Sequence, residues 1–129
     1  MRPASTQDVS LVIRFCNQHN IDFSIRGGGH GYTCQAVKDS GVMIDTRRLQ
    51  DCTSVGVAGF SLHGGVHFGA LSEFHGLAVD NILGLTAVVA NGSVVTVDLW
   101  FALRGAGSSF ALVTQLHIQV RDIDLIGGL

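Results

Sequence analysis

Near the start of the chain, apolar residues recur at the spacing of one face of a helix. The residues at this spacing are Val9, Val12, Ile13 and Cys16. Ser5 or Thr6 can cap the amino end of such a helix, and the carboxylate of Asp8 suits its first turn. The spacing is lost at residues 19–20. The pattern therefore predicts a helix that begins at Ser5 or Thr6 and ends at residues 19–20.

Two short strands are predicted after this helix. Ile21, Phe23 and Ile25 alternate with polar residues, as in a strand that leads into the glycine-rich stretch that follows. The apolar run 42–44 ends at Asp45 and is typical of a second, buried strand. A strand, a connecting segment and a strand in this order suit an α/β layer.

The second half of the chain predicts an antiparallel hairpin. Its two apolar runs, over 82–90 and 93–97, are joined by Asn91-Gly92, a strong signal for a tight turn between strands. A final strand is expected over 111–120, where apolar and polar residues alternate. The core positions of this last strand are Val113, Leu116, Ile118 and Val120.

Two further helices are expected between these strands. Residues 70–75 allow a short helix that Gly76 closes, and Asp98 can cap a helix over 99–104. The glycine-dense segment 54–69 predicts tight turns near a bound group and not a continuous helix.

Composition limits the classes of function. A chain of 129 residues forms one domain at most, and its 17 glycines with a single proline indicate specific backbone positions and not a linker. A formal net charge of −2 provides no basic surface, so nucleic acid is not expected as a partner. With 47% hydrophobic and only 14% charged residues, we expect some apolar surface to face a cofactor or another domain.

Membrane and targeting signals are not recognised. No apolar run approaches the roughly 18 residues that a membrane-spanning helix needs. Arg2-Pro3 leads directly into the predicted helix without the charged-then-apolar pattern of a signal peptide, so the compartment stays open. The three cysteines Cys16, Cys34 and Cys52 lack the CxxC spacing of a zinc site and leave at least one thiol unpaired.

The stretch with the clearest candidate chemistry is Arg26-Gly27-Gly28-Gly29-His30-Gly31-Tyr32. Successive glycines can turn their N–H groups inward without Cβ clashes and so form an anion-binding concavity. The guanidinium of Arg26 suits phosphate oxygens, and His30 would stand beside the bound group. The alternative is a glycine-rich turn between two strands with a solvated histidine.

Other standard sites are disfavoured. The P-loop pattern and the Gly-x-Ser-x-Gly elbow of hydrolases do not occur in the chain. The nearest approaches to the dinucleotide fingerprint, at 29–34 and 105–110, both fail at the last position. His63 and His67 are four residues apart, but Gly64-Gly65 between them argues against a metal-binding helix, and no metal site is expected.

Taken together, the motifs resemble the FAD-binding domain of the berberine bridge enzyme-like flavoproteins, within the vanillyl-alcohol-oxidase or PCMH-type superfamily. The resemblance covers nearly the whole chain, and its motifs stand in family order. These motifs are Arg2-Pro3-x-Ser5-Thr6-x-Asp8-Val9, Ile25-Arg26-Gly27-Gly28-Gly29-His30-Gly31-Tyr32, Ile44-Asp45, Cys52-x-Ser54-Val55-Gly56-Val57-x-Gly59, Gly76-Leu77-Ala78-x-Asp80-Asn81, Asn91-Gly92, Leu99-Trp100-Phe101-Ala102-Leu103-Arg104-Gly105 and Val113-Thr114.

The resemblance implies an α+β fold of the PCMH type, in which a small parallel strand layer with a helix precedes a mainly antiparallel sheet. It implies a shortened FAD-binding domain over 1–122, a frayed tail over 123–129 and no substrate domain. Family members have a long segment with further strands and a helix between the positions of Leu49 and Cys52, where this chain has two residues. The family pattern also has several further residues between the positions of Val97 and Asp98.

The same resemblance implies FAD as the cofactor and a role in hydride transfer from an alcohol, sugar or benzylic carbon to flavin N5, with reoxidation by dioxygen. His30 and Cys52 match the residues that many members bond to the flavin 8α carbon and to C6, and imidazole and thiolate are suitable nucleophiles. The implied cofactor-binding residues are Arg26, Gly27, Gly28, Gly29, His30, Gly31, Cys52, Val55, Gly56, Val57, Gly59 and Val113.

Three interpretations stay open at this stage. The chain can be the FAD-binding domain of an oxidoreductase that acts on a small molecule, although no residue matches the catalytic base of the family. It can be an inactive product of a truncated gene, or a non-catalytic module whose apolar surface docks onto a separate chain. Full-length relatives are often secreted.

Overall fold

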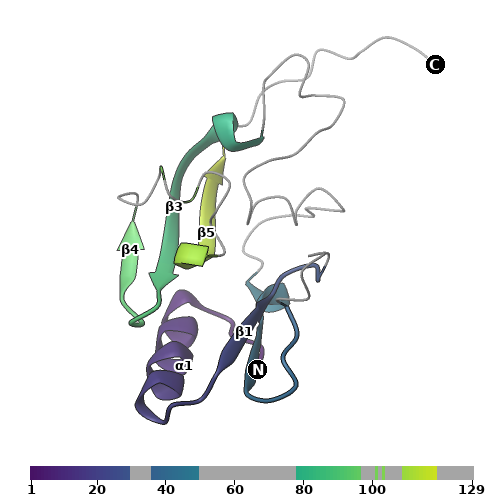
Figure 1. The fold of residues 1–129 in the computed structure, drawn as a ribbon. Helices are drawn as coiled ribbons and strands as arrows, with labels where there is room; N and C mark the ends of the chain where they lie inside the picture. The colour runs from purple at the N-terminus through teal and green to yellow at the C-terminus, as the bar shows by residue number, and fades with distance from the viewer. Residues whose placement is uncertain (30–35, 50–77, 97–100, 102, 104–108, 119–129) are drawn as a thin grey trace, which may run out of the picture.

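The computed structural model describes residues 1–29, 36–49, 78–96, 101, 103 and 109–118 (Figure 1). The helix expected over 70–75 and the turns expected over 54–69 lie outside these residues. Of the helix expected over 99–104, the structure describes Phe101 and Leu103, and both are helical.

The first element is helix α1 (Thr6–Gln18), which confirms the helix predicted from the apolar spacing. Ser5 is its N-cap and forms a capping box with Asp8. The Ser5 hydroxyl accepts from the Asp8 amide at 3.1 Å, and the Asp8 carboxylate accepts from the Ser5 amide at 3.1 Å. The helix buries one face, and its buried apolar residues are Val9, Val12, Ile13 and Cys16.

Strands β1 (Phe23–Arg26) and β2 (Val42–Asp45) form a parallel pair, as the strand order predicted. Gly41 has φ +110° directly before β2, and a Cβ there would collide with the carbonyl of Asp22. That carbonyl accepts the Val42 amide at 2.9 Å, so glycine is required where the chain enters β2. A single 3-10 turn, η1 (Thr46–Arg48), follows β2 and was not predicted.

The second half forms a three-stranded antiparallel sheet in the order β4-β3-β5 (Figure 1). Its strands are β3 (Ile82–Val89), β4 (Val94–Thr96) and β5 (Ala111–Ile118), preceded by a 3-10 turn, η3 (Ala78–Asn81). The predicted hairpin and last strand are therefore confirmed. Gly92 has φ +81°, the left-handed conformation that a tight turn between β3 and β4 requires.

One apolar core joins the two sheets. Its fully or nearly buried members come from α1, β2, β3 and β5 and are Val9, Val12, Ile13, Cys16, Ile44, Val88 and Leu112. A second cluster lies against the antiparallel sheet and contains Leu85, Ala87, Leu103 and Ala111. Since β3 contributes to both clusters, the antiparallel sheet is covered by apolar side chains on both faces.

Hydrogen bonds from α1 also hold the antiparallel sheet. The Ser10 hydroxyl donates to the carbonyl of Gly92 at 2.5 Å, and the side-chain amide of Asn17 donates to the carbonyl of Ala90 at 2.7 Å. At the other end of the helix, the Thr6 hydroxyl donates to Thr114 on β5 at 2.9 Å. These bonds fix the helix, and with it the parallel pair, relative to the hairpin.

Within the part of the chain that the structure describes, no helix is long and apolar enough to cross a membrane.

Candidate functional site

The candidate site begins where the two parallel strands end. Arg26, the last residue of β1, is the register partner of Asp45, the last residue of β2. The carboxyl ends of both strands therefore lie at the same edge, and the glycine-rich stretch leaves β1 at that edge. In open α/β sheets this edge is where ligands bind.

The Arg26 side chain lies close to the described part of the glycine-rich stretch. Gly29 has φ +79°, and a Cβ at this position would lie 3.4 Å from Nε and 3.9 Å from Nη2 of Arg26. The guanidinium therefore folds back over the backbone of the turn. Gly28 and Gly29 are exposed and Arg26 is half-buried, so this cation stands beside accessible backbone.

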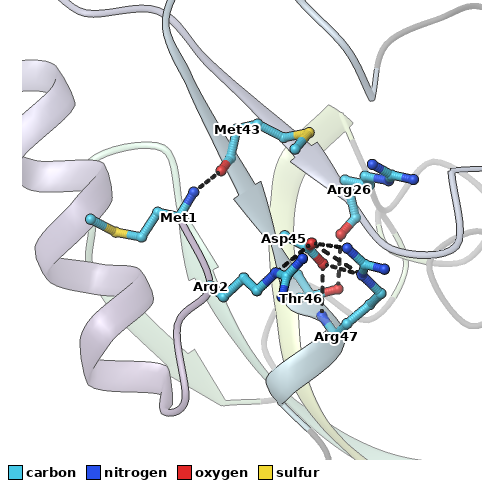
Figure 2. Close-up of polar contacts among 7 residues, drawn as sticks. All are labelled: Met1, Arg2, Arg26, Met43, Asp45, Thr46 and Arg47. Atoms are coloured by element: carbon cyan, nitrogen blue, oxygen red, sulfur yellow. Dashed lines mark hydrogen bonds and ion pairs between the residues drawn. The ribbon is translucent and has the colours of Figure 1, made fainter.

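Asp45 forms the centre of an ion cluster at the end of β2. Its side chain is only 3% exposed, and its carboxylate accepts from Arg2 Nε at 3.2 Å and from Arg47 Nη2 at 2.5 Å. Arg47 also donates its Nε at 2.9 Å and its backbone amide at 3.2 Å to the same carboxylate. Figure 2 shows the carboxylate between the two guanidiniums. A buried carboxylate with this many donors is fully satisfied.

This cluster keeps Asp45 ionised. The Arg47 guanidinium, hydrogen-bonded to the carboxylate, holds the pKa of Asp45 far below its usual range, and Arg2 acts in the same direction. Burial opposes them and is outweighed. The same contact raises the pKa of Arg47. Because Asp45 holds its charge so firmly, it is not suited to accept a proton as a general base.

Arg26 differs from Arg2 and Arg47, the two arginines that pair with Asp45. Its guanidinium forms no hydrogen bond or ion pair with any residue that the structure describes, and it points away from the Asp45 carboxylate (Figure 2). Its backbone carbonyl accepts a hydrogen bond from the Thr46 hydroxyl at 3.2 Å. Arg26 is thus a cation without a carboxylate partner among the described residues, next to a glycine turn.

The structure describes five of the predicted site residues. It brings four of them together, Arg26 and the three glycines 27–29. The fifth, Val113, lies on β5 as the register partner of Ala87, and its side chain packs against the second apolar cluster. The predicted residues His30, Gly31, Cys52, Val55, Gly56, Val57 and Gly59 lie outside the described residues.

Sequence reasoning missed the roles of Arg2, Thr46 and Arg47. Asp45 was recognised only as the end of an apolar strand and as part of a family motif. An acidic residue that ends a buried strand, with a basic residue two positions later, is a signal that could have pointed to the ion cluster.

The donor set at this edge fits a phosphate-bearing group. A guanidinium pairs with two phosphate oxygens at once, and glycine backbone allows close approach of an anion. The absence of a carboxylate beside Arg26 in the described part removes a competitor for the guanidinium. The pyrophosphate of a dinucleotide such as FAD has this chemistry.

Comparison with known proteins identifies the family. Residues 1–66 match the family described as FAD binding domain. An FAD-linked oxidoreductase, iacH, of Pestalotiopsis fici is 30% identical over 93% of this chain and 31% of its own length. That alignment runs over 162 positions, more than the 129 residues of this chain, so the relative has internal segments without a counterpart here.

Solved structures agree with this match. The 6-hydroxy-D-nicotine oxidase from Arthrobacter nicotinovorans superposes with a TM-score of 0.78 at 27% identity, over 92% of this chain and 35% of its own. Glucooligosaccharide oxidase from Acremonium strictum, which is described with a 6-S-cysteinyl, 8α-N1-histidyl FAD, gives 0.74 at 27% identity over 91% and 34%. The chain thus spans about a third of the length of these relatives.

The neighbours share the PCMH-type fold, which confirms the α+β class with its parallel and antiparallel sheets. The family match extends over more than half of the chain and includes the glycine turn at the strand ends. The chain therefore belongs to the FAD-binding domain family of the FAD-linked oxidoreductases, the group of the berberine bridge enzyme-like and vanillyl-alcohol-oxidase flavoproteins, and its cofactor is FAD.

Proposed function

We propose that this chain forms the FAD-binding part of an oxidoreductase that oxidises an alcohol, sugar or benzylic carbon of a small molecule. When bound, FAD would supply the redox chemistry, a two-electron oxidation by hydride transfer to N5 with reoxidation by dioxygen. In the family, relatives are named as oxidases of 6-hydroxynicotine and of oligosaccharides, which supports a small organic substrate.

One observation carries this proposal for the chain itself. The Arg26 guanidinium lies over the Gly29 backbone and forms no ion pair with the described residues, whereas Arg2 and Arg47 are both engaged by Asp45. In the proposed complex Arg26 pairs with the FAD pyrophosphate, and the amides of the turn 27–31 approach the same oxygens.

The remaining predicted residues complete the proposed site. We propose that His30 bonds to the flavin 8α carbon and Cys52 to C6, by analogy with the doubly linked FAD named for the Acremonium oxidase. Val55, Gly56, Val57 and Gly59 are proposed to lie against the cofactor, and Val113 to contact it through its backbone.

Among the described residues, the buried carboxylates include none that suits the role of catalytic base. Asp45 is the one buried carboxylate in the described part of the chain, and its two arginine partners keep it ionised. We therefore propose that substrate contacts and the base come from other parts of the enzyme, since the chain spans only about a third of the length of its relatives.

The proposal is tested on the purified chain by visible absorption and intact mass after reconstitution with FAD. We expect flavin absorption bands that stay with the protein on gel filtration. Covalent attachment predicts a mass gain of one FAD that survives denaturation. In the His30→Ala and Cys52→Ala variants each change removes one link, and the double variant should release its flavin on denaturation.

A cooperative thermal transition establishes that the tested chain is folded. A folded chain that acquires neither flavin absorption nor mass would overturn the proposal and favour a non-catalytic module. A chain that aggregates without any cooperative transition would favour the inactive product of a truncated gene.

A further inference from the structure

We propose that Thr46 is a positioning residue for the phosphate-binding turn, acting through the peptide group that joins Arg26 to Gly27. The proposal rests on the proposed function and adds to it a residue that does not touch the cofactor. Its basis is one contact across the parallel pair: the Thr46 hydroxyl donates to the Arg26 carbonyl at 3.2 Å (Figure 2).

The geometry of the peptide group explains why this contact matters. The carbonyl of Arg26 and the N–H of Gly27 belong to one planar unit, and no cis peptide occurs in the described residues. In a trans peptide the two groups point in opposite directions. A hydrogen bond that holds the carbonyl toward β2 therefore aims the first N–H of the glycine turn away from β2.

Such a restraint is needed where glycines follow. The peptide plane between Arg26 and Gly27 is oriented by ψ of Arg26 and φ of Gly27, and because glycine leaves its φ weakly restrained, a hydrogen bond to the Arg26 carbonyl adds a needed restraint. An anion site made of backbone N–H groups requires those groups to point inward before the anion arrives. The Thr46 hydroxyl provides this hold on the side of the turn opposite to the proposed ligand.

Thr46 is itself held firmly. It directly follows Asp45, whose buried carboxylate is bonded by Arg2 and Arg47, and it begins the single turn of η1. Its carbonyl accepts the Leu49 amide at 2.9 Å. The Asp45 cluster therefore holds in place the backbone from which the Thr46 hydroxyl reaches the Arg26 carbonyl.

The test compares a ligand with phosphates and a ligand without them. The titrations use the full chain with His30→Ala and Cys52→Ala, in which neither proposed attachment atom remains and flavin binding stays reversible. Dissociation constants for FAD and for riboflavin are measured by flavin fluorescence in this background and with Thr46→Val, Thr46→Ser or Arg26→Gln added.

We expect Thr46→Val, which keeps the shape and loses the hydroxyl, to weaken FAD binding about threefold to tenfold. Riboflavin binding should change less than about twofold, because riboflavin has no phosphate for the turn to bind. Thr46→Ser should restore FAD binding to the level of the parent. The melting temperature of the valine variant, measured alongside, separates positioning from loss of the fold.

Two results would overturn the inference while leaving the proposed function intact. In the first, Arg26→Gln weakens FAD binding and Thr46→Val does not. In the second, Thr46→Val weakens FAD and riboflavin equally, which indicates a general structural role. If the folded parent does not bind FAD, or if Arg26→Gln leaves FAD binding unchanged, the proposed function itself fails at this turn.

Discussion

The Nε atom of Arg26 lies 3.4 Å from the point that a Cβ on Gly29 would occupy. Such a Cβ would make only van der Waals contact with the guanidinium, so glycine is required at this position for its positive φ of +79°. The relationship links a local backbone conformation to the position of Arg26, which, unlike Arg2 and Arg47, forms no ion pair with the described residues.

Replacing Gly29 should show this conformational requirement. We expect Gly29→Ala to lower the free energy of unfolding by about 1–2 kcal/mol, because alanine is strained at positive φ. Asparagine tolerates this conformation better, so Gly29→Asn should recover part of the stability in urea unfolding. Equal stability of the alanine variant and the wild type would contradict the conformational requirement.

The hairpin turn gives a second test of the fold. Gly92 has φ +81°, and a Cβ there would collide with Cγ of Arg14 and lie 3.2 Å from the Ser10 carbonyl. Gly92→Ala should therefore lower the free energy of unfolding by more than about 1 kcal/mol. Combining it with Arg14→Ala removes the side-chain part of the collision, and a double-mutant cycle should show partial recovery. Strictly additive losses would mean that Arg14 does not contact this turn.

Asp45 predicts a pH dependence with a defined sign. Because the pKa of Asp45 is lowered in the folded state, its ionised form stabilises the fold above the unfolded carboxyl value of about 3.9. This stabilisation is lost as the pH falls below that value. Thermal unfolding should show Asp45→Asn less stable than the wild type at pH 7, and the difference should shrink on acidification below about pH 4.

A matched control for that variant lies on the surface. Asp22 pairs with Lys38 at 3.0 Å, but its side chain is 74% exposed, and exposed pairs contribute little to stability. Asp22→Asn should therefore leave the melting temperature nearly unchanged at both pH values. A difference between wild type and Asp45→Asn that stays constant across this pH range would contradict the ionised cluster.

The apolar core that joins the two sheets can be tested at Ile44. Its side chain is fully buried between α1 and the antiparallel sheet, in the cluster that also contains Val88 and Leu112. Ile44→Ala should lower the free energy of unfolding by about 2–5 kcal/mol through lost burial and a cavity. Leu11, 64% exposed on α1, provides the comparison, and Leu11→Ala should change the same quantity by about 0.5 kcal/mol or less. Similar losses for both would argue against a core shared by the two sheets.

Much of this fold could be predicted from local patterns. The apolar spacing of α1 and its Ser5–Asp8 capping box, the alternation in β1 and β5, and the Asn91-Gly92 turn all act over a few residues. Each of these features is decided by side chains that are close in sequence, so periodicity and turn chemistry were sufficient to find them.

The ion cluster could not be predicted in this way. Arg2 and Asp45 are 43 positions apart, and the Thr46 contact with Arg26 spans 20 positions. Both depend on how β1 and β2 pair and on where the residues before α1 run. The sequence pattern identified the glycine turn and Arg26 as an anion site, but it could not show that Asp45 engages Arg2 and Arg47.

The central claim is that this chain binds FAD through the turn that follows β1. Titration with FAD of the chain that carries His30→Ala and Cys52→Ala, with and without Arg26→Gln added, tests it most directly. Loss of a charge-assisted contact should weaken FAD binding about tenfold to a hundredfold at unchanged melting temperature. Saturable FAD binding that Arg26→Gln does not alter, or a folded chain that binds no FAD, would contradict the account.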